Sequence, residues 1–145
     1  MQILMNNILK ENVIVLFDVL EHLCDPVSVF KIIHQKLRKN GYCMAFTPNI
    51  FSVGYELMGA KQNTLLPFEH LCFYNKESLS YLANQSNFRI DDIETRGLDI
   101  MDYLLMKEYE DSYPYTDRLK DMMQLVQAIL DKKELSNHFR ITFRK

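Results

Sequence analysis

The sequence VIVLFDVLEHLCDP (residues 13–26) contains the pattern that decides the fold. Its first five residues, 13–17, are all apolar, and four of them are β-branched or aromatic. Such a run is too short for a globular helix and is typical of a strand buried on both faces of a parallel sheet. Three ionisable residues, Asp18, Glu21 and His22, follow directly. Because open α/β sheets bind ligands beyond the carboxyl ends of their strands, this stretch predicts both a fold class and a site.

The residues after this stretch predict a strand–helix–strand unit. Asp25 is a favourable N-cap, Pro26 suits the first helical position, and apolar residues then recur at helical spacing as far as residues 40–41. Residues 42–47 (YCMAFT) are typical of a second buried strand. A strand, a helix and a parallel strand form a βαβ unit, whose crossover we expect to be right-handed.

The rest of the chain predicts further helices and strands, with Asn75 as a second N-cap. We expect helices over 50–58, 76–85, 99–110 and 116–133, a loop over 59–67, and strands over 88–95 and 138–144. The last strand alternates apolar and polar residues, which predicts that one of its faces is solvated.

Length and composition indicate one domain, with a lead-in segment over residues 1–12 and the domain proper over 13–145. The net charge of −2 gives no electrostatic footprint for nucleic acid or for an acidic membrane. Three widely spaced cysteines favour reduced thiols and therefore a cytoplasmic location, and Cys43 is expected in the core. The sequence has neither a run of ~20 apolar residues nor the layout of a signal peptide.

Several motifs together resemble a known family. They are FDVLEHLCDP (17–26), LRKNGYCMAFTPN (37–49), PFEHLCFYNKESLSYLANQSNF (67–88) and FRITFRK (139–145). In order and spacing they resemble the second half of class I S-adenosylmethionine-dependent methyltransferases, in particular the ubiquinone-type O-methyltransferase and small-RNA 2′-O-methyltransferase branches. The resemblance implies an α/β fold: a partial Rossmann-like methyltransferase sheet of later parallel strands, an antiparallel closing strand and flanking helices.

The resemblance also implies a cofactor and a reaction. The cofactor is S-adenosylmethionine, and its methyl group goes to a hydroxyl or other nucleophile of a small-molecule acceptor. The glycine-rich loop that holds the cofactor in this family is missing, since none of the four glycines precedes residue 13. We therefore expect a truncated methyltransferase. The alternatives are a non-catalytic remnant that acts as a dimeric or interaction module, and a metal-dependent hydrolase or nuclease.

In the family, the strand that corresponds to residues 13–17 is hydrogen-bonded on both sides. The strands of the first half of the fold are missing here, so one edge of this strand would be uncovered. An uncovered apolar edge pairs readily with another chain. We expect a homodimer through this edge, or residues 1–12 folded over it. A third alternative is that the chain is a fragment of a longer product, either cut or read from an internal start.

Seven residues are candidates for the site by this resemblance. Asp18 and Glu21 are expected to bind the cofactor, His22 and Asn49 to be catalytic, and Tyr55, His70 and Phe73 to bind the substrate. Each has a structural alternative: Pro–Asn is favourable turn chemistry, and aromatic residues are often core residues. Two further histidines, His34 and His138, are expected to be ordinary packed or surface residues.

A divalent ion is a further expectation from the resemblance, with Glu21, His22 and His70 as ligands. Such an ion binds substrate hydroxyls and lowers their pKa. In the family it is usually magnesium, but two imidazoles suit manganese, iron or zinc at least as well. The alternatives are that His22 is a general base, or that Glu21 and His22 line the cofactor cleft or cap the next helix.

Overall fold

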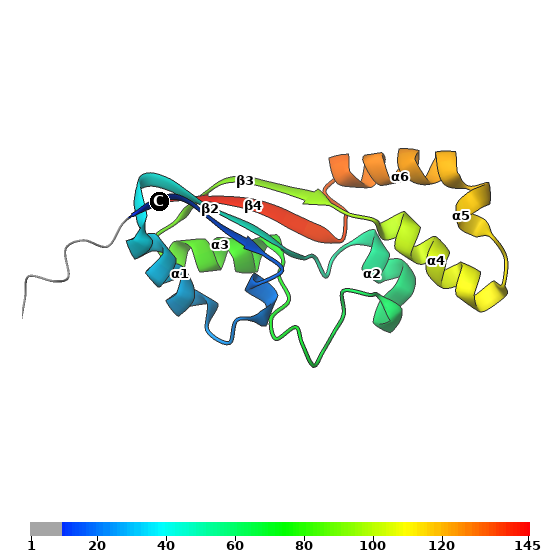
Figure 1. Cartoon of the computed structure of the whole chain (residues 1–145), viewed down its shortest axis with the longest axis horizontal. Helices are drawn as coiled ribbons and strands as arrows, with labels where there is room; N and C mark the ends of the chain where they lie inside the picture. Colours follow the sequence, from blue (N-terminus) through cyan, green and yellow to red (C-terminus); the bar gives the residue numbers. More distant parts are fainter. Residues whose placement is uncertain (1–9) are drawn as a thin grey trace, which may run out of the picture.

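The computed structural model describes residues 10–145, which form a four-stranded sheet with helices on one face and at one end (Figure 1). The strands are β1 Glu11–Phe17, β2 Leu37–Pro48, β3 Arg89–Arg96 and β4 His138–Arg144. Their order is β1-β2-β4-β3, in which β1 and β2 are parallel and β4 is antiparallel to both of its neighbours. An antiparallel closing strand inserted beside parallel strands confirms the predicted fold class.

The helices fall into two groups. The α-helices are α1 Pro26–Lys36, α2 Val53–Met58, α3 Lys76–Gln85, α4 Asp99–Asp111, α5 Tyr115–Arg118 and α6 Lys120–Lys132. Two short 3-10 helices are η1 Leu20–His22 and η2 Gly59–Lys61. Helices α1 and α3 lie against one face of the sheet, whereas α2, α4, α5 and α6 extend beyond its end (Figure 1). No helix in residues 10–145 has the length and apolar character to cross a membrane.

Both long helices under the sheet begin at the predicted N-caps. The side chain of Asp25 accepts a hydrogen bond from Ser28 N at 3.0 Å, with Pro26 at the first helical position. Asn75 forms a capping box with Ser78 in α3. These local contacts fix where α1 and α3 begin.

The core lies between the sheet and these two helices. Phe139, Ile141 and Phe143 of β4 are at most 2% exposed, and the ring of Phe143 lies 5.0 Å from that of Phe30 in α1. The other residues of β4 face away from the core, as the period-two pattern predicted. Cys43 is fully buried, as expected, and burial raises the pKa of its thiol to about 12.

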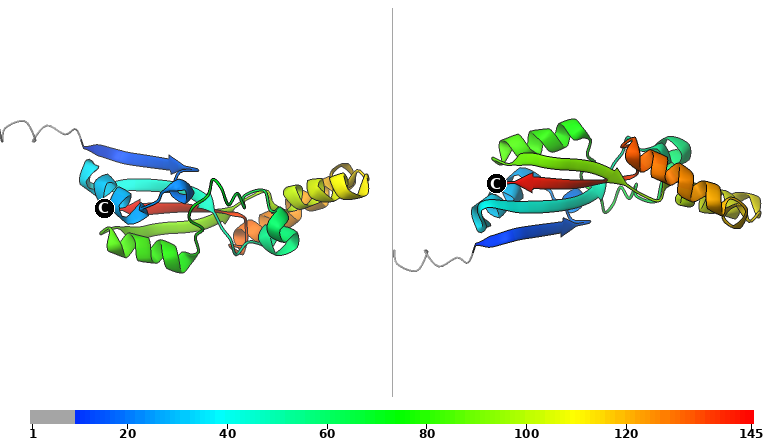
Figure 2. Two further views of the ribbon diagram at one scale, coloured as in Figure 1. Left: turned by 90° about the horizontal axis from the view of Figure 1, so that it is seen from below. Right: turned by 90° about the horizontal axis from the view of Figure 1, so that it is seen from above.

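The prediction that the first strand is buried on both faces is wrong. Ile14 and Leu16 lie against the core, but Val13, Val15 and Phe17 are 46%, 45% and 65% exposed on the opposite face. Viewed from that side, the strands lie in front of α1 and α3, and β1 forms one edge of the sheet (Figure 2, right). An apolar run therefore predicted the strand correctly but not the number of its faces that are covered.

Some boundaries also differ from the prediction. Helix α1 ends at Lys36 instead of continuing to residues 40–41, because β2 begins at once and carries a bulge in which Asn40 takes a φ of 61°. The helix predicted over 116–133 breaks at Leu119 into α5 and α6. Strand β1 begins at Glu11, inside the lead-in segment; the fold-over expected of residues 1–12 lies, for 1–9, outside the described residues.

Candidate functional site

The candidate site lies where the parallel strands end. Strand β1 is followed by η1, β2 by the turn into α2, and β3 by α4, so these three connections lie at the same end of the sheet (Figure 1). Asp18 makes the turn out of β1 with a φ of 50°, and its N–H donates to the carbonyl of Phe46 in β2 at 3.2 Å. This turn places Glu21 and His22 at the strand ends, as the sequence predicted for open α/β sheets.

Glu21 is the buried member of the site, with 1% of its surface exposed. Its Oε2 accepts a hydrogen bond from the Thr47 hydroxyl at 2.9 Å, whereas its fully enclosed Oε1 has no partner. A buried carboxylate oxygen without a donor is costly. Glu21 Oε1 is therefore an acceptor that a bound group can satisfy.

The loop over residues 62–75 is fastened to η1 by backbone hydrogen bonds. The N–H groups of Leu71 and Cys72 donate to the carbonyl of Glu21 at 2.8 and 3.0 Å. The Tyr74 hydroxyl donates to the carbonyl of Leu20 at 3.2 Å, and burial raises the pKa of that hydroxyl. These contacts bring His70 next to residues almost fifty positions earlier in the chain.

The imidazoles of His22 and His70 meet at an interplanar angle of 78°, with their centroids 4.8 Å apart. Nδ1 of His22 lies 2.7 Å from the carbonyl of Glu69, and Nδ1 of His70 lies 2.8 Å from that of Thr64. A carbonyl only accepts, so each Nδ1 carries the proton and each Nε2 keeps its lone pair. Neither Nε2 forms a hydrogen bond among residues 10–145, and because His22 is exposed and His70 is half-buried, both can receive a ligand.

Glu21, His22 and His70 therefore form a group that we call the histidine cluster. One ligand atom from each lies within 4.8 Å of the others. Two imidazoles and one carboxylate are a donor set for zinc, manganese or iron. Carbonyls that hold the opposite ring nitrogens are the usual partners of metal-binding histidines, so these residues fit a divalent ion once the rings move slightly inward.

Of the other predicted site residues, Phe73 lies beside the histidine cluster, with its ring 6.0 Å from that of His70. The exposed Asp18 follows β1 directly. Asn49 is 4% exposed, and its side chain is occupied by backbone groups: it donates to the Ser136 carbonyl and accepts from Phe51 N. Tyr55 is 38% exposed on α2 and has no ring contact with the cluster.

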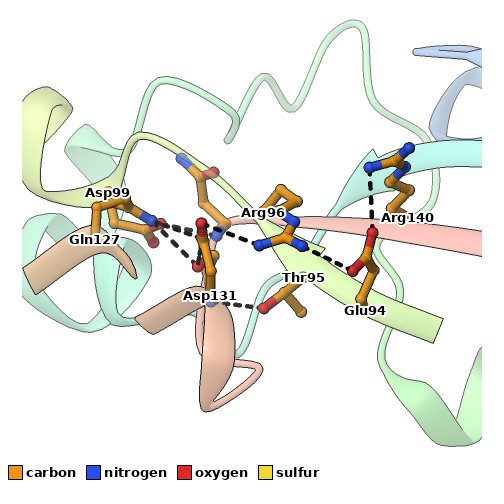
Figure 3. A network of polar contacts seen from close by, with 9 residues as sticks. Glu94, Thr95, Arg96, Asp99, Gln127, Asp131 and Arg140 are labelled. Atoms are coloured by element: carbon orange, nitrogen blue, oxygen red, sulfur yellow. Dashed lines mark hydrogen bonds and ion pairs between the residues drawn. The ribbon is translucent and has the colours of Figure 1, made fainter. Parts of the chain in front are cut away.

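A second buried polar group at this end of the sheet was not predicted from the sequence. We call it the Asp99 network; its hydrogen bonds join Asp99, Gln127, Asp131, Ser136 and Asn137. Figure 3 labels Asp99, Gln127 and Asp131 of this network. The fully buried carboxylate of Asp99 accepts from Gly54 N at 2.9 Å, from Asn137 N at 3.0 Å and from Gln127 Nε2 at 3.2 Å. The network joins α2, α4, α6 and the start of β4.

Sequence reasoning also missed Thr47 and His138. The sequence carried one signal for Thr47: it ends the strand next to β1, so its side chain could have been paired with a residue after β1. For His138 the signal was its position at the start of the closing strand, which lies opposite the ends of β2 and β3.

Comparisons with known proteins identify the family of the chain. The profile of a family described as "Methyltransferase domain" matches residues 9–93, which is more than half of the chain. The chain therefore belongs to this family, that of the class I S-adenosylmethionine-dependent methyltransferases. No curated protein matches the chain in sequence.

Solved structures show the same fold over nearly the whole chain. An S-adenosylmethionine-dependent methyltransferase from Archaeoglobus fulgidus matches 94% of this chain and 60% of its own, with a TM-score of 0.56 and 15% identity. One from Mesorhizobium loti matches 94% and 62%, with a TM-score of 0.56 and 14% identity. Phosphoethanolamine N-methyltransferase 2 from Haemonchus contortus, in complex with S-adenosyl-L-methionine, matches 92% and 33%, with a TM-score of 0.50 and 16% identity. The chain thus spans less than two thirds of each of these relatives.

Proposed function

We propose that this chain is the acceptor side of a methyltransferase that moves a methyl group from S-adenosylmethionine to a hydroxyl or other nucleophile of a small molecule. The observation that carries the proposal is the histidine cluster, in which one ligand atom from each residue lies within 4.8 Å of the others at the ends of the parallel strands. Family membership supports the class of reaction. Transfer between two bound molecules depends on positioning and on removal of the acceptor's proton, and free polar atoms at one strand end suit both tasks.

Asp18 and Glu21 are the residues that we propose for cofactor binding. Asp18 presents an exposed carboxylate directly after β1, where it can accept hydrogen bonds from a hydroxyl or an ammonium group. The bound cofactor supplies a methyl group on a sulfonium. The four glycines of the chain lie at positions 41, 54, 59 and 97, all after β1. The remaining cofactor contacts would come from a glycine-rich segment outside these 145 residues.

On the acceptor side we propose that Glu21, His22 and His70 hold a divalent ion. Such an ion polarises an acceptor hydroxyl and lowers the pKa of that hydroxyl. The partnerless Oε1 of Glu21 and the two free Nε2 atoms support this assignment. Phe73 lies against His70 and would contact the acceptor from the side.

We propose minor roles for the two remaining predicted residues, Asn49 and Tyr55. Asn49 is at most a positioning residue, since both ends of its amide hold the turn after β2. Tyr55 is exposed on α2, and we retain it as a candidate for binding the acceptor.

Calorimetry with S-adenosylmethionine and with its demethylated product tests the proposal. We expect saturable binding, and we expect Asp18→Asn to weaken it by tenfold or more, which corresponds to about 1.4 kcal/mol. Asp117→Asn is the matched control, because Asp117 is exposed on α5 and distant in sequence from the strand ends. A folded and monodisperse sample that binds neither compound would rule out catalysis by this chain alone.

A second candidate function is that of an interaction module, and the exposed side of β1 favours it. Val13, Val15 and Phe17 are about half exposed or more, and the outer edge of β1 has no strand beside it among residues 10–145. We propose that a second copy of the chain occupies this edge. A two-fold axis at Ile14 would pair the two strands antiparallel and place Lys10 of each copy opposite Asp18 of the other, so that opposite charges meet at both ends.

Sedimentation analysis tests this dimer. We expect a dimer for the wild-type chain and a monomer for Val15→Lys, because a lysine on an edge strand opposes pairing. Leu125→Lys is the control: Leu125 is 64% exposed on α6, so its replacement leaves the dimer unchanged. A wild-type chain that remains monomeric at its highest soluble concentration would contradict the proposal.

A further inference from the structure

His138 opens β4 at the same end of the sheet as the histidine cluster. In the sheet it pairs with Pro48 at the end of β2 and with Arg96 at the end of β3. Its ring is stacked on that of Phe46, with centroids 4.6 Å apart and an interplanar angle of 6°. This stacking fixes the plane of the imidazole on the sheet face opposite the core.

Hydrogen bonds fix the tautomer of this ring. The Nδ2 amide of Asn137 donates to Asp102 at 3.2 Å, which leaves the Asn137 Oδ1 to face His138 Nδ1 at 2.9 Å. An amide oxygen accepts only, so Nδ1 carries the proton and Nε2 has the lone pair. Nε2 of His138 has no hydrogen-bond partner among residues 10–145, and it is not fully enclosed by the protein.

The charges around the ring suit a proton acceptor. Burial lowers the pKa of His138, which keeps the imidazole neutral at pH 7, and the carboxylates of Asp18, Glu21, Asp99 and Asp102 oppose this shift. Arg96, across the sheet pair, already has Glu94 and Asp131 as partners. An imidazolium formed here would therefore face several carboxylates, and the two cations on this side, Arg96 and Arg140, already have acidic partners.

We propose that His138 is a catalytic residue that takes the proton of the methyl acceptor through Nε2. This step rests on the proposed function. As the acceptor oxygen or nitrogen forms its bond to the methyl carbon, the carbon–sulfur bond breaks, the sulfonium becomes a thioether, and the acceptor proton moves to Nε2. The resulting imidazolium then returns this proton to water. His22 cannot serve in this way while its Nε2 holds an ion.

The same surroundings define the class of acceptor. Four carboxylates near His138 disfavour a molecule that carries a phosphate or a carboxylate of its own. Beside His138, the ring of Phe46 meets that of Phe17 edge-on at 6.4 Å, and Phe17 is 65% exposed. The geometry fits a hydroxyl or an amine on a molecule without negative charge that can lie against these rings.

The state of the ring is tested by nitrogen NMR of the imidazoles as a function of pH. We expect His138 in the Nδ1–H form, with a pKa below 6.5, and we expect Asn137→Leu to lose this preference for Nδ1–H. Asn84→Leu, at an exposed position of α3, serves as the control and leaves the His138 signals unchanged. A proton found on Nε2 of the neutral ring in the wild-type chain would overturn the proposal.

The role in transfer is tested by kinetics with phenol as the acceptor. We expect His138→Gln to lower kcat by a factor of about 100 or more while leaving binding of S-adenosylmethionine intact, and we expect the deficit to shrink as pH approaches the phenol pKa of about 10. His34→Gln is the control. Intact cofactor binding with an unchanged kcat would refute only the role of His138, whereas a wild-type chain that binds no S-adenosylmethionine would rule out catalysis by this chain alone.

Discussion

The histidine cluster and the Asp99 network lie at the same end of the sheet, yet they differ in how completely their hydrogen bonds are made. Asp99 has three donors, and no fully buried polar atom of its network lacks a partner. In the histidine cluster, the buried Oε1 of Glu21 and two imidazole nitrogens lack one. The hydrogen bonds of the Asp99 network join segments of the chain, whereas the histidine cluster has polar atoms available to bind another molecule.

This difference separates structural from functional polarity. Buried polar groups in native proteins are normally paired, so each unpaired one requires an explanation, and for Glu21 we propose a bound ion. The side-chain amide of Gln62 is also buried without a partner among residues 10–145. His138 stands between the two groups: Asn137 of the Asp99 network holds its Nδ1, and its Nε2 is free like those of the cluster. Variants that remove bonds from each group should therefore affect different properties.

Removal of Asp99 is expected to have the largest effect. Asp99→Ala would leave the N–H groups of Gly54 and Asn137 buried without an acceptor, at a cost of about 4 kcal/mol in the free energy of unfolding. Urea denaturation measures this loss. Asp91→Ala is the control: its ion pairs with Arg89 and Arg144 are exposed and are worth less than about 1 kcal/mol. Similar losses in both variants would remove the distinction that we draw.

A change next to the network is expected to cost slightly less. A Cβ at Gly97 would lie 2.2 Å from Asn137 Oδ1 and 2.9 Å from Asn137 N, so Gly97→Ala should destabilise the chain by about 3 kcal/mol. Gly59→Ala is the matched control. A Cβ there meets nothing within 4 Å, but the backbone angles, φ 54° and ψ −128°, are ones that only glycine adopts readily, which opposes the change at about 2 kcal/mol. A greater loss at Gly59 than at Gly97 would contradict this account of the network.

The sequence predicted the fold wherever local chemistry decides it. Asp25 and Asn75 cap their helices through bonds to residues three positions away, and the apolar run after residue 12 forms the expected strand. The prediction from the sequence failed where contacts between distant segments determine the structure. The exposure of Val15 depends on what else covers the sheet, and the end of α1 depends on where Leu37 joins β2.

The site was predictable only in part for the same reason. Glu21 and His22 were predicted because they directly follow the first strand. His70 was predicted from the resemblance to the methyltransferase family. The bond from Thr47 to Glu21 crosses 26 positions, and Asn137 meets Asp102 across 35. No local pattern encodes such pairs. The start of α5 is similar, since Glu108 of the preceding helix accepts a hydrogen bond from Thr116 N across eight positions.

Zinc should separate the two groups by a gain of stability rather than a loss. At a free concentration 100 times its dissociation constant, an ion that binds only the folded chain raises the free energy of unfolding by about 2.7 kcal/mol. His70→Ala should reduce this gain to less than about 0.5 kcal/mol, because the ion loses one of three ligands. Thermal denaturation with and without zinc measures both values.

Two controls accompany the zinc experiment. His34→Ala, on α1, should retain the full gain, and Asp99→Ala should be stabilised by zinc as much as the wild-type chain if it remains folded. Glu21→Gln should lose most of the gain, yet change the zinc-free stability little, because a glutamine oxygen can still accept from Thr47. A wild-type chain that gains nothing from zinc would remove the metal from the proposed function.

The pH dependence of stability is expected to be the smallest effect, and it concerns the residue between the two groups. Burial lowers the pKa of His138 in the folded chain below its ordinary value of 6.5. Between these two values the unfolded chain binds more protons, so the free energy of unfolding rises with pH, by at most about 1.4 kcal/mol per pH unit for one proton. The stabilisation is complete above 6.5 and is lost as pH falls toward the folded value.

Urea denaturation between pH 5 and 8 measures this slope in the metal-free chain. His138→Gln should flatten it, and so should His34→Gln, because burial also lowers the pKa of His34. Asp102 acts in the opposite direction: burial raises its pKa, so its contribution falls as pH rises above 3.8. If His138→Gln leaves the slope as steep as in the wild-type chain, burial does not keep the imidazole of His138 neutral. Its Nε2 would then differ from the free imidazole nitrogens of the histidine cluster.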